Sequence, residues 1–255
     1  MNNILHFDTI NSNYDPSLND PFRTSMIMNN PIAGVRSINL KSIELPIGFF
    51  NVRASGTLNQ VTISLNNVNY TITLTSKNYT TISSLCTDIN TAYTSVNFGV
   101  STTVTFTASG NYVNVSITST GITQFSIVNT LLSQYVLGLR STNTAVIASS
   151  TSASISSTNI WNLGCDNYLN MFLENIPVGG NSNHNGKLCS FKISLNGVNG
   201  MVMFNNDENL FKQSVHISDE NYILREIKVV MYDRFGNNLS NNGLDYSFSL
   251  GLNFH

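Results

Sequence analysis

Hydrophobic and polar residues alternate along residues 244–255 with the two-residue period of a β-strand that buries one face. Serine, glycine and other polar residues fill the positions between six apolar ones, which are Leu244, Tyr246, Phe248, Leu250, Leu252 and Phe254. A strand this regular needs neighbours on both edges, or another subunit, because a free edge pairs with other chains. The pattern therefore predicts a structural strand, twelve residues long, at this end of the sequence.

Turn-forming residues separate this strand from a second β-rich segment. Residues 224–232 are rich in β-formers, and residues 233–238 form a turn signal in which Gly236 or Asn237 can supply a positive φ. A second break falls at residues 241–243. These signals predict either a β-hairpin or a corner between two sheets.

The first fifty residues predict one further strand behind an extended segment. Residues 1–34 mix turn formers with short apolar pieces, which predicts an extended arm with one or two strands. The dense apolar positions of residues 35–50 predict a strand that bends after Pro46, because proline cannot continue a central ladder.

Between residues 56 and 159 the pattern of apolar and polar residues changes, and we interpret this part as an inserted subdomain. Residues 61–65 and 70–74 alternate around an Asn-Asn turn, and residues 104–107 and 112–117 predict a second hairpin. A helix is predicted to begin at Thr80 or Thr81, because five apolar residues follow at helical spacing: Ile82, Leu85, Cys86, Ile89 and Tyr93. A helical turn at 131–137 should stop at Gly138. The Ser/Thr-rich residues 141–159 predict a strand followed by a linker.

Strand signals resume after residue 160. They fall at residues 168–173, 188–195, 202–204 and 215–217, so about eight strands flank the insertion. Eight strands suffice for one jelly roll and are too few for two. The sequence thus predicts an all-β fold: a single jelly-roll β-sandwich from residues 1–55 and 160–255, with a small α+β subdomain inserted at residues 56–159.

Two strings carry a resemblance to a known family. They are SINLKSIELPIGFFNVR at 37–53 and LREIKVVMYDRFGNNLSNNGLDYSFSLGLNF at 224–254. Both resemble the penton and minor capsid proteins of virophages, polinton-like elements and giant DNA viruses, which share a closing D-R-F/Y-G … N-G-L-D hairpin and an early K-S-x-E-[LI]-P strand. The positions that match the early motif are Lys41, Ser42, Glu44, Leu45, Pro46, Phe49, Phe50 and Asn51. The resemblance implies a single jelly roll that serves in a viral capsid.

Composition supports assembly and disfavours nucleic-acid binding. Charged residues make up only 10% of the chain, against about 25% in ordinary soluble proteins. A surface with so little charge lacks the repulsion that keeps monomers apart, although a biased, AT-rich genome is an alternative cause. The net charge is −2 and no Lys/Arg cluster is present, so the chain cannot offer the basic face that phosphate contacts require.

Cysteine usage and hydropathy indicate where the protein works. Three widely spaced cysteines, Cys86, Cys165 and Cys189, suggest neither a disulfide framework nor a metal motif. No signal-peptide pattern and no stretch of about 20 apolar residues occurs. We therefore expect a protein without a membrane span, made in the host cytoplasm, and we expect the four glycosylation sequons to be incidental.

Candidate chemistry is sparse. No histidine among His6, His184, His216 and His255 has metal-ligand spacing to another ligand, and neither Asp207-Glu208 nor Asp219-Glu220 can converge on one bond, because neighbours on a strand point to opposite faces. Asp8, Asn11, Asn13 and Asp15 could hold calcium but lack EF-hand spacing, so turn and capping roles are favoured. Trp161, the only tryptophan, is either a packing residue or, if exposed, a sugar-stacking platform. We predict no catalytic residue, no metal site, no cofactor and no enzymatic activity.

These observations favour a viral capsid structural protein. The resemblance implies the pentameric penton of an icosahedral double-stranded DNA virus or virophage, a homopentamer in the virion that borders the major capsid protein. The alternative is a carbohydrate-binding or fibre-type attachment module, because β-sandwiches rich in Asn, Ser and Thr suit glycan contact. Both functions could coexist if the inserted subdomain projects from the particle and binds a host-surface glycan.

Overall fold

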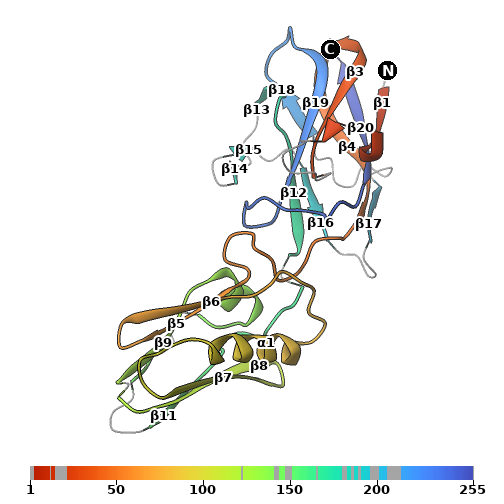
Figure 1. Cartoon of the computed structure of the whole chain (residues 1–255). Coiled ribbons are helices and arrows are strands. Elements are labelled where there is room, and N and C mark those ends of the chain that lie inside the picture. The colour runs from red at the N-terminus through yellow and green to blue at the C-terminus, as the bar shows by residue number, and fades with distance from the viewer. Residues whose placement is uncertain are drawn as a thin grey trace. The chain divides into compact units, whose positions relative to one another are not determined.

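The computed structural model divides the chain into two compact units (Figure 1). It describes residues 3–11, 13–14, 22–121, 123–140, 144–146, 151–164, 166–179, 183–184, 187–188, 191–195, 201–205 and 214–254. Unit 1 comprises Met1–Phe49 and Asp166–His255, and unit 2 comprises Phe50–Cys165. That residues 56–159 form a domain of their own, inserted into residues 1–55 and 160–255, stays a prediction.

Unit 1 contains two antiparallel sheets around one apolar core. Sheet A has the order β1 (Asn3–Asp8), β20 (Ser247–Phe254), β4 (Val35–Pro46), β18 (Ser214–Ile217) and β13 (Val178–Gly179), and β17 (Met201–Asn205) also pairs with β4. Sheet B has the order β16 (Phe191–Ser194), β12 (Tyr168–Leu173), β19 (Ile223–Tyr232), β3 (Arg23–Ala33) and β2 (Asn13–Tyr14). The short strands β14 (Asn183–His184) and β15 (Lys187–Leu188) pair with each other, and the 3-10 turn η1 spans Thr9–Asn11. The prediction of a mostly β, sandwich-like protein is confirmed at this level.

The closing strand is shorter than its alternation predicted. β20 begins at Ser247, whereas Leu244 is 45% exposed and lies in the preceding turn. Two neighbours, β1 and β4, pair with β20, as expected for a strand of this regularity. Phe248, Leu250 and Leu252 are buried in the core. Alternation alone overestimated the strand because a turn residue can be apolar without being buried.

The turn before β20 connects the two sheets, so the segment is a corner and not a hairpin. β19 belongs to sheet B and β20 to sheet A. The fully buried carboxylate of Asp233 accepts hydrogen bonds from the main-chain N–H groups of Phe235 (2.9 Å) and Asn237 (2.8 Å). Gly236 adopts the predicted positive φ of 81°. The buried carboxylate of Asp233 therefore stabilises the turn through hydrogen bonds to the main chain of the turn.

Residues 1–34 contain strands, as predicted, but those among the described residues belong to the core sheets and do not extend as an arm. β1 pairs along all six of its residues with β20, and β3 pairs with β19 as an eleven-residue strand of sheet B. In β1 the partly buried Leu5 and Phe7 alternate with the exposed His6 and Asp8. The alternation was masked by the turn formers around it.

One edge of β4 carries two strands in succession. β17 pairs with residues 42–46 of β4 and β18 with residues 37–39, both antiparallel. The two strands follow one another along β4 in the same direction: Met201 of β17 lies opposite Pro46, and His216 of β18 lies opposite Ser37. β17 and β18 therefore act as one interrupted strand of sheet A.

Unit 2 contains two small sheets, an α-helix and a π-helical turn. The first sheet has the order β10 (Thr144–Val146), β9 (Gln124–Val128), β5 (Gln60–Leu65) and β6 (Val68–Thr73). The second has the order β11 (Ser152–Ser156), β8 (Tyr112–Ser119) and β7 (Thr102–Ser109). The helices are α1 (Ile82–Thr94) and η2 (Leu132–Val136). Residues 141–159 thus hold two strands, β10 and β11, where one strand and a linker were predicted.

Helix α1 matches its sequence pattern and anchors the core of unit 2. Thr81 is the N-cap and its Oγ1 accepts a hydrogen bond from the N–H of Ser84, at 3.2 Å. The buried stripe comprises the five predicted residues, Ile82, Leu85, Cys86, Ile89 and Tyr93. The ring of Tyr93 stacks on Phe106 of β7, with 5.9 Å between centroids. No helix within the described ranges is long and apolar enough to cross a membrane.

Candidate assembly surface

One side of unit 1 presents two strands with open outer edges in the part of the chain that the structure describes. β1 ends sheet A and pairs only with β20. β3 is next to last in sheet B, and the two-residue β2 covers only Thr24 and Ser25. Figure 1 shows β1 and β3 along the same side of unit 1. Open edges carry unpaired main-chain groups that can bind another chain.

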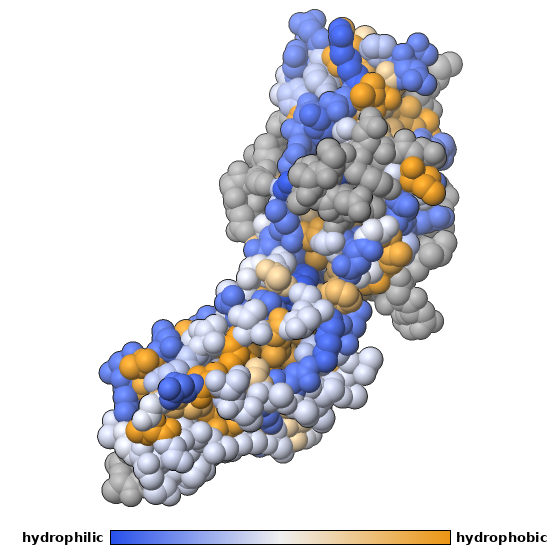
Figure 2. All heavy atoms as spheres, viewed as in Figure 1, coloured by the Kyte–Doolittle hydropathy of each residue, from blue (hydrophilic) through white to orange (hydrophobic). Residues whose placement is uncertain are grey.

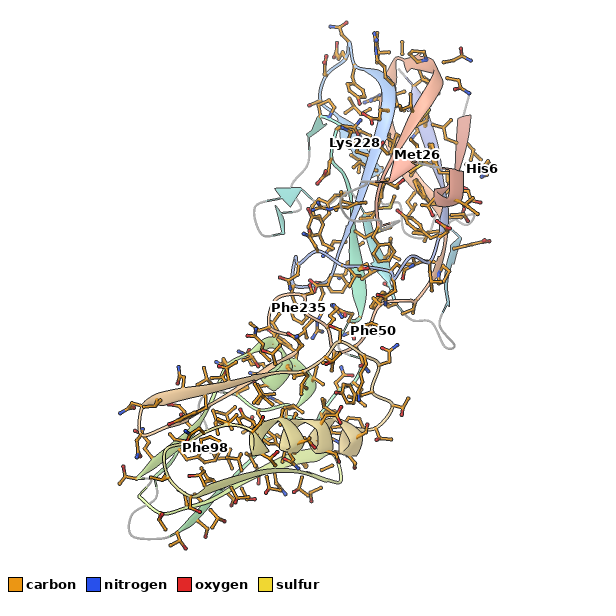
Figure 3. All side chains as sticks on the ribbon, viewed as in Figure 1. His6, Met26, Phe50, Phe98, Lys228 and Phe235 are labelled. Carbon is orange, nitrogen blue, oxygen red and sulfur yellow. The ribbon has the colours of Figure 1, made fainter. Side chains whose placement is uncertain are left out.

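The edge strand β1 divides its side chains between the core and solvent. Leu5 and Phe7 pack against the core, where Phe7 stacks on Phe248 with 5.0 Å between ring centroids. On the other face Ile4 is 52% exposed, and Nδ1 of His6 lies 2.7 Å from Oγ of Ser249 (Figure 3). β1 is therefore held firmly while an isoleucine remains available at its edge.

The strand β3 has the most exposed large apolar side chain of the described residues. Met26 is buried in the core, whereas its neighbour Ile27 points outward and is 69% exposed. Ile27 lies opposite Glu226 of β19, whose carboxylate is 3.6 Å from Nζ of Lys228. An apolar residue beside a charged pair resembles the apolar centre and polar rim of protein interfaces. Ile4 and Ile27 face away from the core on sheets A and B respectively, and we call them, together with the open edges of β1 and β3, the assembly surface.

A one-residue connection brings β3 to this side. β3 ends at Ala33, β4 begins at Val35, and only Gly34 lies between them. Its φ is 73°, a left-handed conformation that favours glycine. The chain thereby passes from the edge region of sheet B to the centre of sheet A in a single step.

The other end of sheet B has a different chemical character. There β16 buries Phe191 and Ile193 in the core. Its residue Lys192 is exposed and places Nζ 3.8 Å from the centroid of the Tyr168 ring. The two sides of unit 1 are thus chemically unlike, one with exposed isoleucines and one with a lysine on an aromatic ring.

Among the described residues, the histidines and carboxylates singled out in the sequence do not form a cluster that could hold a metal ion. His216 is exposed on β18. Asp8 accepts from the N–H of Ile10 (3.1 Å), which is the turn role favoured above, and Asp219 accepts from the N–H of Asn221 (2.9 Å). No group of three or more His, Cys, Asp or Glu residues that could hold a metal ion occurs within the described residues.

Several candidates cannot be placed. The side chains of Asn11, Asn13 and His184, and all of Asp15, Cys165, Cys189, Asp207, Glu208 and His255, lie outside the described residues. Cys86 is a buried free thiol in α1, and desolvation raises its pKa to about 11. It packs as a small apolar residue. The indole N–H of Trp161 donates to the carbonyl of Gly110 at 3.0 Å.

The sequence contains a local signal for the exposure of Ile27. Residues 26–28 read Met-Ile-Met, and three consecutive apolar residues on a strand place apolar side chains on both faces. A strand with one buried face therefore has to expose one of them. For Ile4 the surrounding turn formers obscured the strand, so its exposure could not be predicted.

Comparisons with known proteins give little. No protein-family model and no curated protein matches the chain. Among solved structures, a crystal structure of the selenomethionine-labelled mavirus penton protein is similar to this chain at 12% identity and a TM-score of 0.39. The similarity covers 100% of this chain and 99% of the mavirus chain.

Proposed function

We propose that the protein is a structural protein of a viral capsid and that unit 1 is a single jelly roll. The observation that carries this proposal is the strand order. If β1, β3, β4, β12, β16, the interrupted β17–β18, β19 and β20 are counted one to eight, sheet A reads 1-8-3-6 and sheet B reads 5-4-7-2. This order is expected of a jelly roll, in which two Greek keys wind into two sheets. Jelly rolls occur in viral capsid proteins and in lectins.

The resemblance of the two sequence strings favours the capsid among these classes. The strings meet in unit 1, where the N–H of Gly48 donates to Oδ1 of Asn241 at 2.8 Å and Nδ2 of Asn242 donates to the carbonyl of Gly48. Phe22 lies beside both of them, with ring centroids 6.5 Å from Phe49 and 5.6 Å from Tyr246. Residues of the two strings therefore contact each other directly in unit 1.

Within the capsid, the function we propose is the penton, a homopentamer at the vertex. A ring closes when each subunit offers one patch to one neighbour and a different patch to the other. Unit 1 has two chemically unlike sides, and the assembly surface is one of them. The ring would border the major capsid protein in the virion and form in the host cytoplasm. Unit 2, which follows β4 in the chain, would be an inserted domain.

The test is the oligomeric state of the full chain and of matched variants. Sedimentation velocity of the wild type should show pentamers that increase with concentration. Ile4→Asp and Ile27→Asp should each shift the distribution toward monomers, because a buried carboxylate at the interface lacks a partner. Val100→Asp, at a 47% exposed valine of unit 2, is the control and should assemble like the wild type.

A strictly monomeric wild type at all concentrations, with and without added major capsid protein, would contradict the proposed penton. A pentamer that both aspartate variants form as readily as the wild type would contradict the assembly surface, because the contact would then lie elsewhere. Far-UV circular dichroism of each variant separates loss of assembly from loss of folding.

A further inference from the structure

A second surface gathers aromatic side chains at the tip of the β7–β8 hairpin in unit 2. The segment that follows β11 crosses this tip: the N–H of Trp161 donates to the carbonyl of Asn111 at 3.1 Å. The indole N–H of the same residue donates to the carbonyl of Gly110 at 3.0 Å. Trp161 is thus fixed at two points over the hairpin turn.

Two exposed apolar residues are direct chain neighbours of the residues that this hydrogen bond joins. Tyr112, the first residue of β8, is 46% exposed, and Ile160 is 62% exposed. Trp161 itself is partly exposed. Tyr112 follows Asn111 directly, and Ile160 precedes Trp161 directly, so the hydrogen bond between Trp161 and Asn111 holds all of them within one small area. We call Tyr112, Ile160 and Trp161 the tip surface.

The polar groups around the tip surface are amides and hydroxyls. Asn111, Thr158 and Asn162 are all exposed beside it. They can donate and accept hydrogen bonds without carrying charge. The surface therefore combines flat apolar rings with neutral hydrogen-bonding groups.

Unit 2 as a whole is almost free of charge. Of the chain's 12 Lys and Arg and 14 Asp and Glu residues, it contains only four, which are Arg53, Lys77, Asp88 and Arg140. Lys77 and Asp88 neutralise each other in an ion pair of 2.6 Å, and Arg53 is only 6% exposed. In Figure 2 the visible face of unit 2 is mostly in the pale tones of weakly polar residues. A charged ligand would find little to attract it, and phosphate binding would require several cations on one face.

We propose that the tip surface binds a neutral glycan by stacking a hexose ring on Tyr112 and Trp161. The C–H face of a pyranose is apolar, and its rim of hydroxyls needs hydrogen-bonding partners without needing charge. Aromatic rings with polar neighbours match both requirements. Because Trp161 is already held by two hydrogen bonds, little side-chain freedom is lost when a sugar stacks on it. This inference does not depend on assembly of the proposed penton.

The experiment uses the full chain and an array of neutral oligosaccharides with terminal glucose, galactose, mannose or N-acetylhexosamine, together with sialylated and sulfated counterparts. The best neutral oligosaccharide is then titrated while the fluorescence of Trp161 is followed. Because Trp161 is the only tryptophan, a change in its emission reports directly on the tip surface. We expect saturable binding that is unchanged between about 50 and 500 mM salt, since no ion pair is screened.

Variants test the role of the rings. Tyr112→Ala should weaken binding about tenfold or more, the loss expected when one stacking contact is removed. Tyr112→Phe keeps the ring and should bind within about twofold of the wild type. Val68→Ala, at a 53% exposed valine on the β5–β6 hairpin, is the control and should bind like the wild type. Circular dichroism confirms that each variant is folded.

Three outcomes would overturn the proposal. The first is that no neutral oligosaccharide binds at millimolar concentration. The second is that only the acidic glycans bind, which would indicate charge recognition elsewhere on the chain. The third is that a folded Tyr112→Ala protein binds the neutral glycan as tightly as the wild type.

Discussion

Gly48 should be among the least replaceable residues of unit 1. A Cβ atom at this position would approach the main-chain oxygen of Asn241 closer than Cβ atoms do in real proteins, and would lie 2.7 Å from Cδ1 of Leu244. The obstacle is backbone, and it belongs to the turn that Gly48 itself holds through its own N–H and carbonyl groups. Neither Gly48 nor the turn that contains Asn241 can move away without losing these hydrogen bonds.

Gly251 provides a matched comparison in the same unit. A Cβ atom there would lie 2.6 Å from Cε of Lys41, a similarly severe overlap. The obstacle in this case is the far end of a flexible side chain that can move into solvent. Alanine also restricts the unfolded chain more than glycine, which stabilises the folded state by about 0.4–1 kcal/mol where the backbone is compatible.

The two substitutions should therefore differ by several kcal/mol. For Gly48→Ala we expect a loss of about 1–3 kcal/mol from overpacking and about 1 kcal/mol from the strained hydrogen bond. At about 3 °C per kcal/mol, the melting temperature of unit 1 should fall by about 6–12 °C. Gly251→Ala should change the stability by less than about 1 kcal/mol in either direction.

Differential scanning calorimetry of the full chain measures both changes. The reasoning is refuted if Gly48→Ala melts within about 2 °C of the wild type, because the turn would then have to move without cost. It is equally refuted if Gly251→Ala destabilises as much as Gly48→Ala, since the nature of the obstacle would then not matter.

Three further outcomes are expected in unit 2. Thr81→Ala removes the N-cap of α1 and should cost about 1 kcal/mol, measurable by urea unfolding followed through Trp161 fluorescence. Hydrogen bonds from Lys77 and Tyr79 hold the pKa of Asp88 below its ordinary value, so NMR titration of Lys77→Gln should show a higher pKa. Since that pKa is lowered by folding, the contribution of Asp88 to stability is present above its unfolded-state pKa and is lost as the pH falls through the lowered folded-state value. Cys86, with its pKa raised to about 11 by burial, should resist thiol reagents at pH 8 in native protein whose other two cysteines are replaced by serine, and should react once urea is added.

Local patterns predicted α1 and the two hairpins of unit 2, but they missed β9. The spacing that defines α1 depends only on residues within one helix, and Thr81 is a favoured cap by its own chemistry. Likewise, Asn66 and Asn67 adopt positive φ values of 50° and 65°, which asparagine tolerates. Signals of this kind are contained in a few consecutive residues, so sequence alone was enough.

Pairing between distant strands could not be predicted in the same way. Whether the segment from β19 to β20 is a hairpin or a corner depends on which strands pair with each of them. β3 and β12 pair with β19, β4 pairs with β20, and all three lie far away in the chain. The same reason explains the wrong assignment of an N-terminal arm. β1 is a strand of sheet A because β20 offers it a partner.

The distribution of charge connects the two proposals. If the low charge served assembly alone, charged residues should be equally scarce in both units. Almost all charged residues, however, belong to unit 1. There they flank the assembly surface, as Glu226 and Lys228 do beside Ile27, and they discourage mismatched contacts. Unit 2 has almost no charged residues that could discourage mismatched contacts, so its selectivity for a ligand has to come from shape and hydrogen bonds. A unit that met other protein chains with this surface would associate indiscriminately, whereas a unit that met sugars would not need charge at all.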